Sequence, residues 1–199
     1  MPPKVQFSKE QILNAAFDLV INKGIDALSV RVLAKELGCS VAPIYINFKN
    51  TKELFNAVMG KVGEVVWKYS TKNYTKHGFF NIGIGQLLIA KDYPILFKDL
   101  VIKCPEAINM DKTTWNKMVD IMESDEMLKG LNREQCSTIL NKMALQTSGL
   151  SVALANKNSG ITIEDAFLIM EETASQLIYA EQHNFKAFDS GKITIDLNL

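Results

Sequence analysis

Cysteine and histidine are scarce in this sequence, so few thiolate or imidazole ligands are available for a metal site. The 199 residues contain three cysteines, at positions 39, 104 and 136, and two histidines. The cysteines are far apart and form no CxxC pair, which favours reduced thiols in a cytoplasmic protein. Neither His77 nor His183 has a partner at HxxxH or HExxH spacing, so we expect no zinc site, no other metal and no cofactor.

The short signatures of common enzyme classes are also missing. No GxSxG, P-loop or GxGxxG motif occurs, and Gly83-Ile84-Gly85 lacks both a third glycine and a preceding strand. The acidic pairs Asp125-Glu126 and Glu171-Glu172 are typical of a solvated helix surface. The sequence therefore does not indicate an enzyme, and a helical enzyme that uses an internal cavity is the alternative.

Long apolar runs and low-complexity segments are absent as well. No stretch approaches the roughly 18 apolar residues of a membrane span, and the first residues lack the apolar core of a secretory signal. We therefore expect a cytoplasmic protein with no membrane partner. Hydrophobic residues make up 47% of the chain, which is enough for a packed core.

The net charge of zero conceals an asymmetry between the two parts of the chain. Residues 1–76 contain 11 Lys and Arg but 6 Asp and Glu, whereas residues 77–199 contain 11 and 16. A basic segment on an acidic remainder suggests an anionic partner for the first segment. An ordinary solvated surface is the alternative explanation.

The first helix is predicted between Ser8 and Lys23. Ser8 and Gln11 have the spacing of a capping box, in which each side chain bonds the backbone of the other residue. Gly24 is expected to end the helix in the left-handed conformation. Two adjoining apolar rows at helical spacing consist of Ile12, Ala16 and Leu19, and of Leu13, Phe17 and Val20.

Two shorter helices follow. Ser29 is expected to cap one that Gly38 ends, and Ser40 to cap another that runs to Phe48. Pro43 falls in the first turn of the latter, where its missing N–H costs no hydrogen bond. This arrangement predicts a helix-turn-helix, whose second helix usually enters the DNA major groove, with a tight helical corner as the alternative. The apolar positions are Val30, Leu33, Ala34 and Leu37, then Val41, Ile44, Tyr45 and Phe48.

One stretch of about fifty residues resembles the DNA-binding domain of the tetracycline-repressor (TetR) family: ILNAAFDLVINKGIDALSVRVLAKELGCSVAPIYINFKNTKELFNAV. The similar features include the Ala-Ala pair of the first helix, the break at Gly24, and the pair Tyr45-x-x-Phe48. The resemblance implies an all-α homodimer with a DNA-binding domain at residues 6–66, its helix-turn-helix at 29–48, and a ligand-binding and dimerisation domain at 67–199. Most members repress transcription and leave DNA when a small molecule binds.

The resemblance also implies roles for single residues at double-stranded DNA. At the start of the second helix, Ser29 and Arg31 would contact phosphate. A guanine base is a further candidate for this contact. The start of the third helix would face base edges, and the residues after it would reach the DNA backbone. These positions are Ser40, Val41, Ala42 and Pro43 for the bases, and Tyr45, Asn47, Lys49 and Lys52 for the backbone.

Two departures from the family pattern affect these roles. The family usually has lysine at the position of Thr51, where the fourth helix begins, but here the lysine is Lys52. Thr51 is expected instead to cap that helix and present its N-terminus to phosphate. The reading helix also lacks Arg, Lys and Gln, which make bidentate base contacts. We therefore expect discrimination through thymine methyl groups, Arg31 and DNA shape.

The rest of the chain is predicted to be helical. Caps and periodicity give helices at 51–70, 79–90, 94–103, 113–129, 132–156 and 162–183, and alternation after Phe188 suggests a short extended segment. Small residues among large ones on the last two long helices predict a four-helix homodimer interface, with packing inside one subunit as the alternative. These seams contain Ile163, Ala166, Phe167, Met170, Ala174, Leu177 and Ile178, and Ala144, Ser148, Gly149, Ser151, Ala153 and Ala155.

Large apolar residues of the middle helices are candidates for a small-molecule pocket, although core packing is the commoner explanation of such residues. The candidates are Phe79, Phe80, Leu87, Phe97, Trp115, Met118, Met122, Met143, Gln146 and Thr147.

The sequence thus predicts a DNA-binding transcriptional regulator, a repressor released from an inverted-repeat operator by a small, largely apolar effector. The alternative is a helical ligand-binding or interaction protein whose helix-turn-helix no longer reads DNA.

Overall fold

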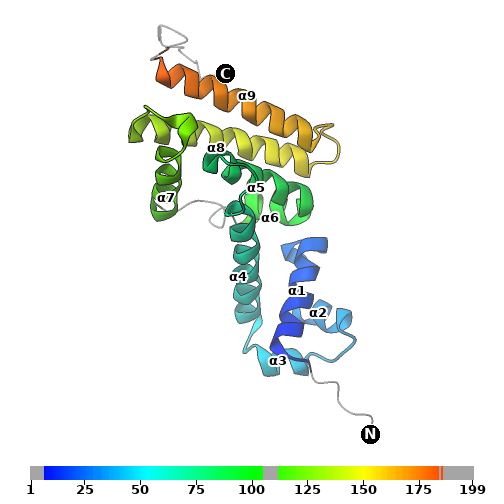
Figure 1. Cartoon of the computed structure of the whole chain (residues 1–199). Helices are drawn as coiled ribbons and strands as arrows, with labels where there is room; N and C mark the ends of the chain where they lie inside the picture. Colours follow the sequence, from blue (N-terminus) through cyan, green and yellow to red (C-terminus); the bar gives the residue numbers. More distant parts are fainter. Residues whose placement is uncertain (1–6, 105–111, 184, 186–199) are drawn as a thin grey trace, which may run out of the picture.

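The computed structural model describes residues 7–104, 112–183 and 185, and it folds this part of the chain into helices without a strand (Figure 1). The predicted all-α class is therefore confirmed. The elements in chain order are α1 (Lys9–Lys23), η1 (Ile25–Ala27), α2 (Val30–Glu36), α3 (Ala42–Asn47), α4 (Thr51–Ser70), α5 (Gly78–Asp92), α6 (Pro94–Lys103), α7 (Lys112–Glu123), η3 (Glu126–Leu128), α8 (Arg133–Ala155) and α9 (Ile163–Gln182).

Helices α1, α2 and α3 pack with the first half of α4 into a small unit, here called the N-terminal bundle. Its centre contains fully buried side chains from all four helices, because the apolar positions of each fall on one face. α2 and α3 lie at the end of the molecule farthest from α8 and α9, and α4 connects the two ends (Figure 1). The fully buried residues of this core include Ile12, Leu33, Ile44, Phe48, Leu54 and Val58.

Four helices begin with the caps that the sequence predicts. The side chain of Ser29 accepts a hydrogen bond from the N–H of Val32 at 3.2 Å. Ser8 with Gln11, Asn132 with Gln135, and Thr162 with Asp165 form complete capping boxes. Each cap satisfies N–H groups that the first turn of a helix leaves without an acceptor, so the positions of these starts are set locally.

Two predicted caps are wrong. Val41 rather than Ser40 precedes the first residue of α3, and its φ of −69° and ψ of −17° are already helical, so no side chain caps this helix. Asn50 caps α4, accepting from the N–H of Glu53 at 2.9 Å, while Thr51 is the first helical residue. Asparagine is the better capping residue of this adjacent pair, which accounts for the shift.

Gly24 ends α1 in a conformation that differs from the predicted left-handed helical one. Its φ is 90° and its ψ is 166°, a region open essentially only to glycine. The turn directs the N–H of Ile25 toward α6, where it donates to Asp99 Oδ2 at 2.6 Å. A short 3₁₀ helix, η1, follows at once and was not predicted.

The C-terminal body is built around α5, which packs against α4, α8 and α9. α7 covers one end of α8 (Figure 1). α7 ends at Glu123, six residues before the predicted end at Lys129, because Asp125 caps η3 by accepting from the N–H of Met127 at 3.1 Å. The main core of this body includes Phe79, Leu87, Val119, Met122, Ile139, Met143, Ala166 and Met170.

The apolar seams of α8 and α9 face the inside of the chain. Five of the seven predicted seam residues on α9 are buried against α5 and α8, so this part of the interface prediction is replaced by its alternative, packing within one subunit. Gly149 on α8 is exposed, with open space around its Cα. The buried seam residues are Ile163, Ala166, Met170, Ala174 and Ile178 on α9, and Ser151 and Ala155 on α8.

A close approach between α4 and α5 depends on Gly85. A Cβ on this residue would lie 2.5 Å from the carbonyl oxygen of Tyr69, which is backbone and cannot move aside. We expect Gly85→Ala to lower the free energy of unfolding by about 1–3 kcal/mol, as overpacking does. Urea denaturation measures it. Gly63→Ala in α4, which meets nothing within 4 Å, is the matched control and should stabilise the chain by up to about 1 kcal/mol. Equal effects of the two variants would contradict the close approach.

Among the described helices, none is long and apolar enough to cross a membrane. The three cysteines all lie in the described part of the chain, and no disulfide joins them. The extended segment predicted after Phe188 falls outside the described residues.

Candidate nucleic-acid interface and interhelical cavity

The inner face of α3 fixes this short helix to the N-terminal bundle. Ile44 and Phe48 are fully buried in the core. The amide nitrogen of Asn47 donates to the carbonyl oxygens of Pro43 at 2.9 Å and Phe7 at 3.2 Å, which ties α3 to the segment before α1. These contacts fix which side of α3 faces solvent.

The outward face of α3 is apolar and exposed. Val41 is 39% exposed, Tyr45 50% and Ile46 83%. Apolar side chains on the outside of a six-residue helix contribute nothing to the core, whereas they suit contact with thymine methyl groups. Ile46 was missing from the predicted set, because isoleucine is ordinarily a core residue. The available signal was that Ile44 and Phe48, four residues apart, already occupy the core positions.

The structure brings most of the predicted DNA-contacting residues to one end of the molecule. Asn47 departs from its predicted role, because both of its amide protons are used within the chain and its remaining oxygen is an acceptor, which a phosphate cannot satisfy. Ser29 and Pro43 are half-buried, and Ser29 is occupied as a helix cap. The exposed members are Arg31, Ser40, Val41, Ala42, Tyr45, Lys49, Thr51 and Lys52.

Three cations beside this face are without a fixed carboxylate. Arg31, Lys49 and Lys52 form no ion pair with another residue of the described chain, whereas Lys9 pairs with Glu53 at 3.6 Å. The Glu53 carboxylate also accepts from the backbone N–H of Lys49 at 2.8 Å. Its charge is therefore balanced, and the net field around the helix-turn-helix is positive, as a phosphate backbone requires.

Helix α6 holds the connection between α1 and α2 through what we call the interdomain clamp, made by Asp99 and Lys103 with Ile25 and Asp26. Asp99 accepts from the Ile25 N–H at 2.6 Å and pairs with Lys103 at 2.7 Å, and Lys103 reaches Asp26 at 2.6 Å. Burial raises the pKa of the Asp99 carboxyl, but the bonds from Lys103 and Ile25 outweigh it and hold this pKa below its usual value. The clamp adds polar contacts to an apolar junction, because Leu96 and Leu100 of α6 belong to the same core as the N-terminal bundle.

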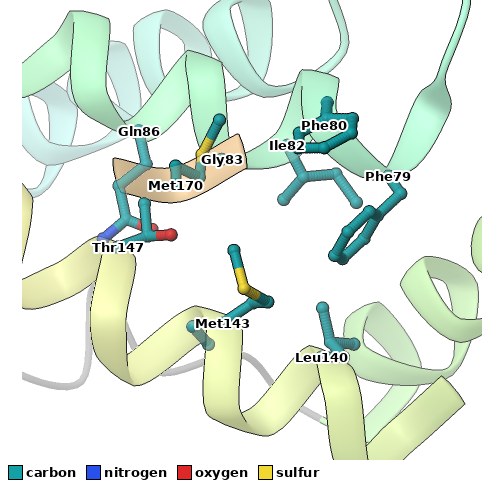
Figure 2. A pocket seen from close by; sticks show the side chains of 10 residues that line it. Phe79, Phe80, Ile82, Gly83, Gln86, Leu140, Met143, Thr147 and Met170 are labelled. Atoms are coloured by element: carbon teal, nitrogen blue, oxygen red, sulfur yellow. The ribbon is translucent and has the colours of Figure 1, made fainter. Parts of the chain in front are cut away.

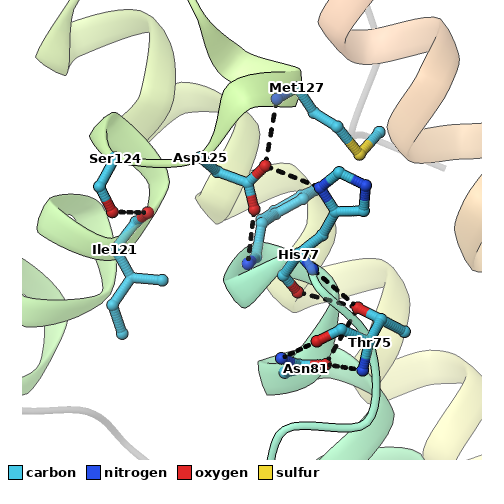
Figure 3. A network of polar contacts seen from close by, with 8 residues as sticks. Thr75, His77, Asn81, Ile121, Ser124, Asp125 and Met127 are labelled. Carbon is cyan, nitrogen blue, oxygen red and sulfur yellow. Dashed lines mark hydrogen bonds and ion pairs between the residues drawn. The ribbon is translucent and has the colours of Figure 1, made fainter.

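A second polar cluster connects the start of α5 to η3 (Figure 3). Asp125 is buried and accepts from His77 Nδ1 at 2.9 Å and from the N–H of Phe79 at 3.4 Å, so its predicted place on a solvated surface is wrong. Burial raises the pKa of Asp125, but hydrogen bonds from His77 and two backbone N–H groups bring it below the usual value. Within the described ranges, no three His, Cys, Asp or Glu side chains are placed to hold a metal ion.

A small cavity of about 30 Å³ lies between α5, α8 and α9 (Figure 2). Four predicted pocket residues line it: Phe79, Phe80, Met143 and Thr147. No pattern in the sequence indicated its other lining residues, because helix pairing decides which sides of α5 and α9 meet α8. Those residues are Ile82, Gly83, Gln86, Leu140, Ala144 and Met170.

The remaining pocket candidates serve other contacts. Phe97 belongs to a separate apolar cluster with Ile89, Ala90 and Ala155. Gln146 donates to the Thr173 hydroxyl on α9 instead of facing the cavity. Trp115 donates to the Ser137 hydroxyl at 3.3 Å. Core packing, the alternative explanation, accounts for Leu87, Met118 and Met122.

The outer surfaces of α8 and α9, which lie side by side (Figure 1), carry exposed apolar side chains. Leu145 is 71% exposed and sits one turn before Gly149, where a neighbouring backbone has room to approach. We call this surface the outer α8–α9 face. Its exposed members are Leu145, Gly149, Val152, Leu168, Ile169 and Tyr179.

Comparison with known proteins agrees with these features. Residues 12–58 match the family model described as bacterial regulatory proteins, tetR family. Among solved structures, the chain is similar to the transcriptional regulator SCO7222, a TetR from Streptomyces coelicolor, with a TM-score of 0.56 and 14% sequence identity over 88% of this chain and 99% of that one. At that identity the likeness concerns the fold. No sequence among the curated proteins matches.

Proposed function

We propose that this chain, whose residues 12–58 match the TetR family model, is a DNA-binding transcriptional regulator of that family. Its action is that of a repressor that a small, largely apolar effector releases from an inverted-repeat operator. It acts as a homodimer in the cytoplasm, and it is not an enzyme. The proposed DNA-contacting residues are Arg31, Ser40, Val41, Ala42, Pro43, Tyr45, Ile46, Lys49, Thr51 and Lys52, with Ser29 as the cap that positions Arg31.

The observation that carries this proposal is the outward face of α3. Exposed apolar side chains there are flanked by three cations with no carboxylate partner in the described chain. Such a surface suits the major groove, in which the apolar groups meet thymine methyls and the cations meet phosphates. Affinity would then come mainly from phosphate contacts, and discrimination from methyl contacts, Arg31 and DNA shape.

Selection of bound duplexes from a random DNA pool tests the proposal. We expect an inverted repeat, because a two-fold dimer presents two α3 helices at equivalent half-sites. The logarithm of affinity should fall with the logarithm of salt concentration, by about 0.9 per phosphate contacted. Arg31→Ala should weaken binding and relax selectivity at one position of each half-site. Recovery of no shared sequence would favour the other candidate function, a ligand-binding or interaction protein that retains the helix-turn-helix as scaffold.

Dimerisation is proposed to use the outer α8–α9 face. Exposed leucines on adjacent helices would lose contact with water in a four-helix arrangement, with Gly149 allowing close approach. We expect Leu145→Glu with Leu168→Glu to give a monomer in sedimentation velocity while the helical circular dichroism is unchanged. The control is Ile102→Glu, which places the same charge at an exposed isoleucine on α6, and this variant should stay dimeric. A double variant that sediments as a dimer would place the interface elsewhere.

The position of the cavity supports release by an effector. It lies against α5, and α5 packs directly on α4, the helix that carries the N-terminal bundle. An effector weakens DNA binding only if it prefers a conformation in which the two bundles no longer fit adjacent half-sites. A tightly bound effector that leaves operator affinity unchanged would refute this part of the proposal.

A further inference from the structure

The hydroxyl of Thr147, which has no hydrogen-bond partner in the described chain, borders the interhelical cavity. Thr147 on α8 is 3% exposed, and its hydroxyl makes no hydrogen bond to another described residue. It points toward the cavity (Figure 2) and lies on the side of Gly83, at 3.7 Å from where a Cβ on that glycine would be. The oxygen is not sealed off by the chain, so it can form a hydrogen bond with a molecule in the cavity.

A second such group lies one turn along the same helix. Ser151 is fully buried, and its hydroxyl also has no partner in the described chain. Residues four apart share a helix face, so both hydroxyls are on the side of α8 that packs against α5. On the same side, Gln86 donates to the Ser148 hydroxyl at 3.1 Å, which leaves the Gln86 carbonyl oxygen beside the cavity. The polar groups of the cavity wall therefore come from Thr147 and Gln86, whereas Ser151 is not among the lining residues.

The cavity wall carries no charged side chain. All ten lining residues are apolar or neutral. A carboxylate or ammonium group in this space would lose its hydration without gaining an opposite charge, which is strongly unfavourable. The wall therefore selects for a neutral molecule that is apolar over most of its surface.

The cavity is smaller than a ligand site but is lined by side chains that can move. About 30 Å³ holds little more than water, whereas ligand pockets are about ten times larger. Met143 and Met170 project into it, and methionine changes shape more readily than other core residues. Ile82, Gly83 and Gln86 are half-exposed, so the space approaches the surface along α5. A compact ligand would enter there and displace the methionine side chains.

We propose that this cavity is the effector site and that its ligand class is a small, neutral, apolar molecule with one hydroxyl-type group that hydrogen-bonds the Thr147 side chain. The inference rests on the proposed effector-responsive function for its biological meaning. The binding site itself stands on the cavity, its neutral wall and the unpartnered hydroxyl.

Three probes with one carbon frame test the ligand class: toluene, benzyl alcohol and benzoate. Each is titrated into the full-length protein without DNA, with calorimetry and the thermal midpoint as readouts. We expect toluene and benzyl alcohol to bind and raise the midpoint, and benzoate to do neither. Failure of both neutral probes to bind below about 5 mM, an affinity well within what ligands with so few atoms can reach, would overturn the proposal. Benzoate binding as tightly as benzyl alcohol would do the same.

Thr147→Val tests the position of the hydroxyl group. The variant removes the hydroxyl and keeps the branched shape, so we expect benzyl alcohol to bind about five- to tenfold more weakly and toluene to bind at least as well. Thr147→Ser should restore most of the benzyl alcohol affinity. The midpoint of the unliganded Val variant should be equal or higher, since an unpartnered hydroxyl is lost. Equal changes for both probes, or a lower midpoint, would assign the hydroxyl a structural role and overturn the proposal.

The ligand site and the DNA-binding function are tested by independent experiments. Probe binding is measured on the free protein, whereas operator selection needs no probe. Thr147-dependent binding together with no selected DNA sequence would uphold the ligand site and reject the regulator. An inverted repeat together with no neutral-probe binding would uphold the regulator and reject this cavity as its effector site.

Discussion

Replacing Ile46 with glutamate should abolish specific duplex binding while leaving the fold intact. The side chain is 83% exposed, so the substitution removes no core contact and the thermal midpoint should change little. At the DNA surface the new carboxylate would face phosphates of its own sign. We expect affinity for the selected duplex to fall at least about 100-fold in a fluorescence anisotropy titration. Each tenfold step corresponds to about 1.4 kcal/mol of binding free energy.

Two companion variants separate charge from shape. Ile102→Glu places the same charge on an isoleucine that is 75% exposed on α6, and it should leave DNA affinity unchanged at moderate salt. Ile46→Ala removes apolar contact without adding charge, and it should weaken binding chiefly to duplexes with thymine at the contacted position. If Ile46→Glu binds as tightly as the unaltered protein, the outward face of α3 does not enter the groove.

Replacing Asp99 with alanine should loosen the attachment of the N-terminal bundle. The Ile25 N–H would lose its acceptor, and Lys103 would keep only its exposed partner Asp26. An unpartnered, partly buried donor costs about 1–3 kcal/mol, so we expect a comparable loss in the free energy of unfolding. Amide exchange in η1 should accelerate more than exchange in α8, because the loss is local to the clamp.

The same carboxyl makes part of the stability depend on pH. The pKa of Asp99 is below its usual value in the folded chain, so the folded state binds this proton more weakly than the unfolded state. Its contribution is present above the unfolded pKa of about 3.9 and is lost as the pH falls through the lower folded value. Urea denaturation at pH 6 and near pH 3 should therefore show a smaller loss for Asp99→Ala than for the unaltered protein. Asp125 contributes in the same direction and is unchanged in this comparison.

A parallel pH dependence in the two proteins would show that the clamp carboxylate contributes nothing to the folded state. Lys103→Met provides the matched control, because it removes the charge beside Asp99 while keeping the acceptor for the Ile25 N–H. We expect this variant to lose less stability than Asp99→Ala, since the backbone donor remains satisfied.

Local interactions explain why most helix positions could be predicted from sequence. α4 and α6 have the predicted bounds, and Ser8, Asn132 and Thr162 cap their helices as expected. Each such signal involves residues within four positions, so it is visible in the sequence. The predicted caps at Ser40 and Thr51 were wrong because a neighbouring residue occupies the N-cap position of each helix.

Tertiary contacts explain what could not be predicted. The Ile25 N–H and Asp99 are 74 positions apart, and no pattern around either residue indicates the other. The same holds for the cavity, whose lining depends on which sides of α5, α8 and α9 meet. Asp125 looked like a surface carboxylate because its partner, His77, belongs to a loop 48 residues earlier. Periodicity identified the apolar sides of α8 and α9, but the partner of each side depends on packing.

The clamp also bears on how freely the DNA-binding part can be exchanged. Its central hydrogen bond is given by a backbone amide, so no side chain of the N-terminal bundle is needed to make it. The clamp requires a glycine at position 24, where a Cβ would lie 2.6 Å from the Asp99 carboxylate, and the joint also needs the apolar residues of α1 that share a core with Leu96 and Leu100. Bundles that keep this glycine can therefore change their reading residues while the joint to α6 stays the same. Under the proposed function, a chimaera joined at this connection would read a different DNA sequence and keep the same effector site.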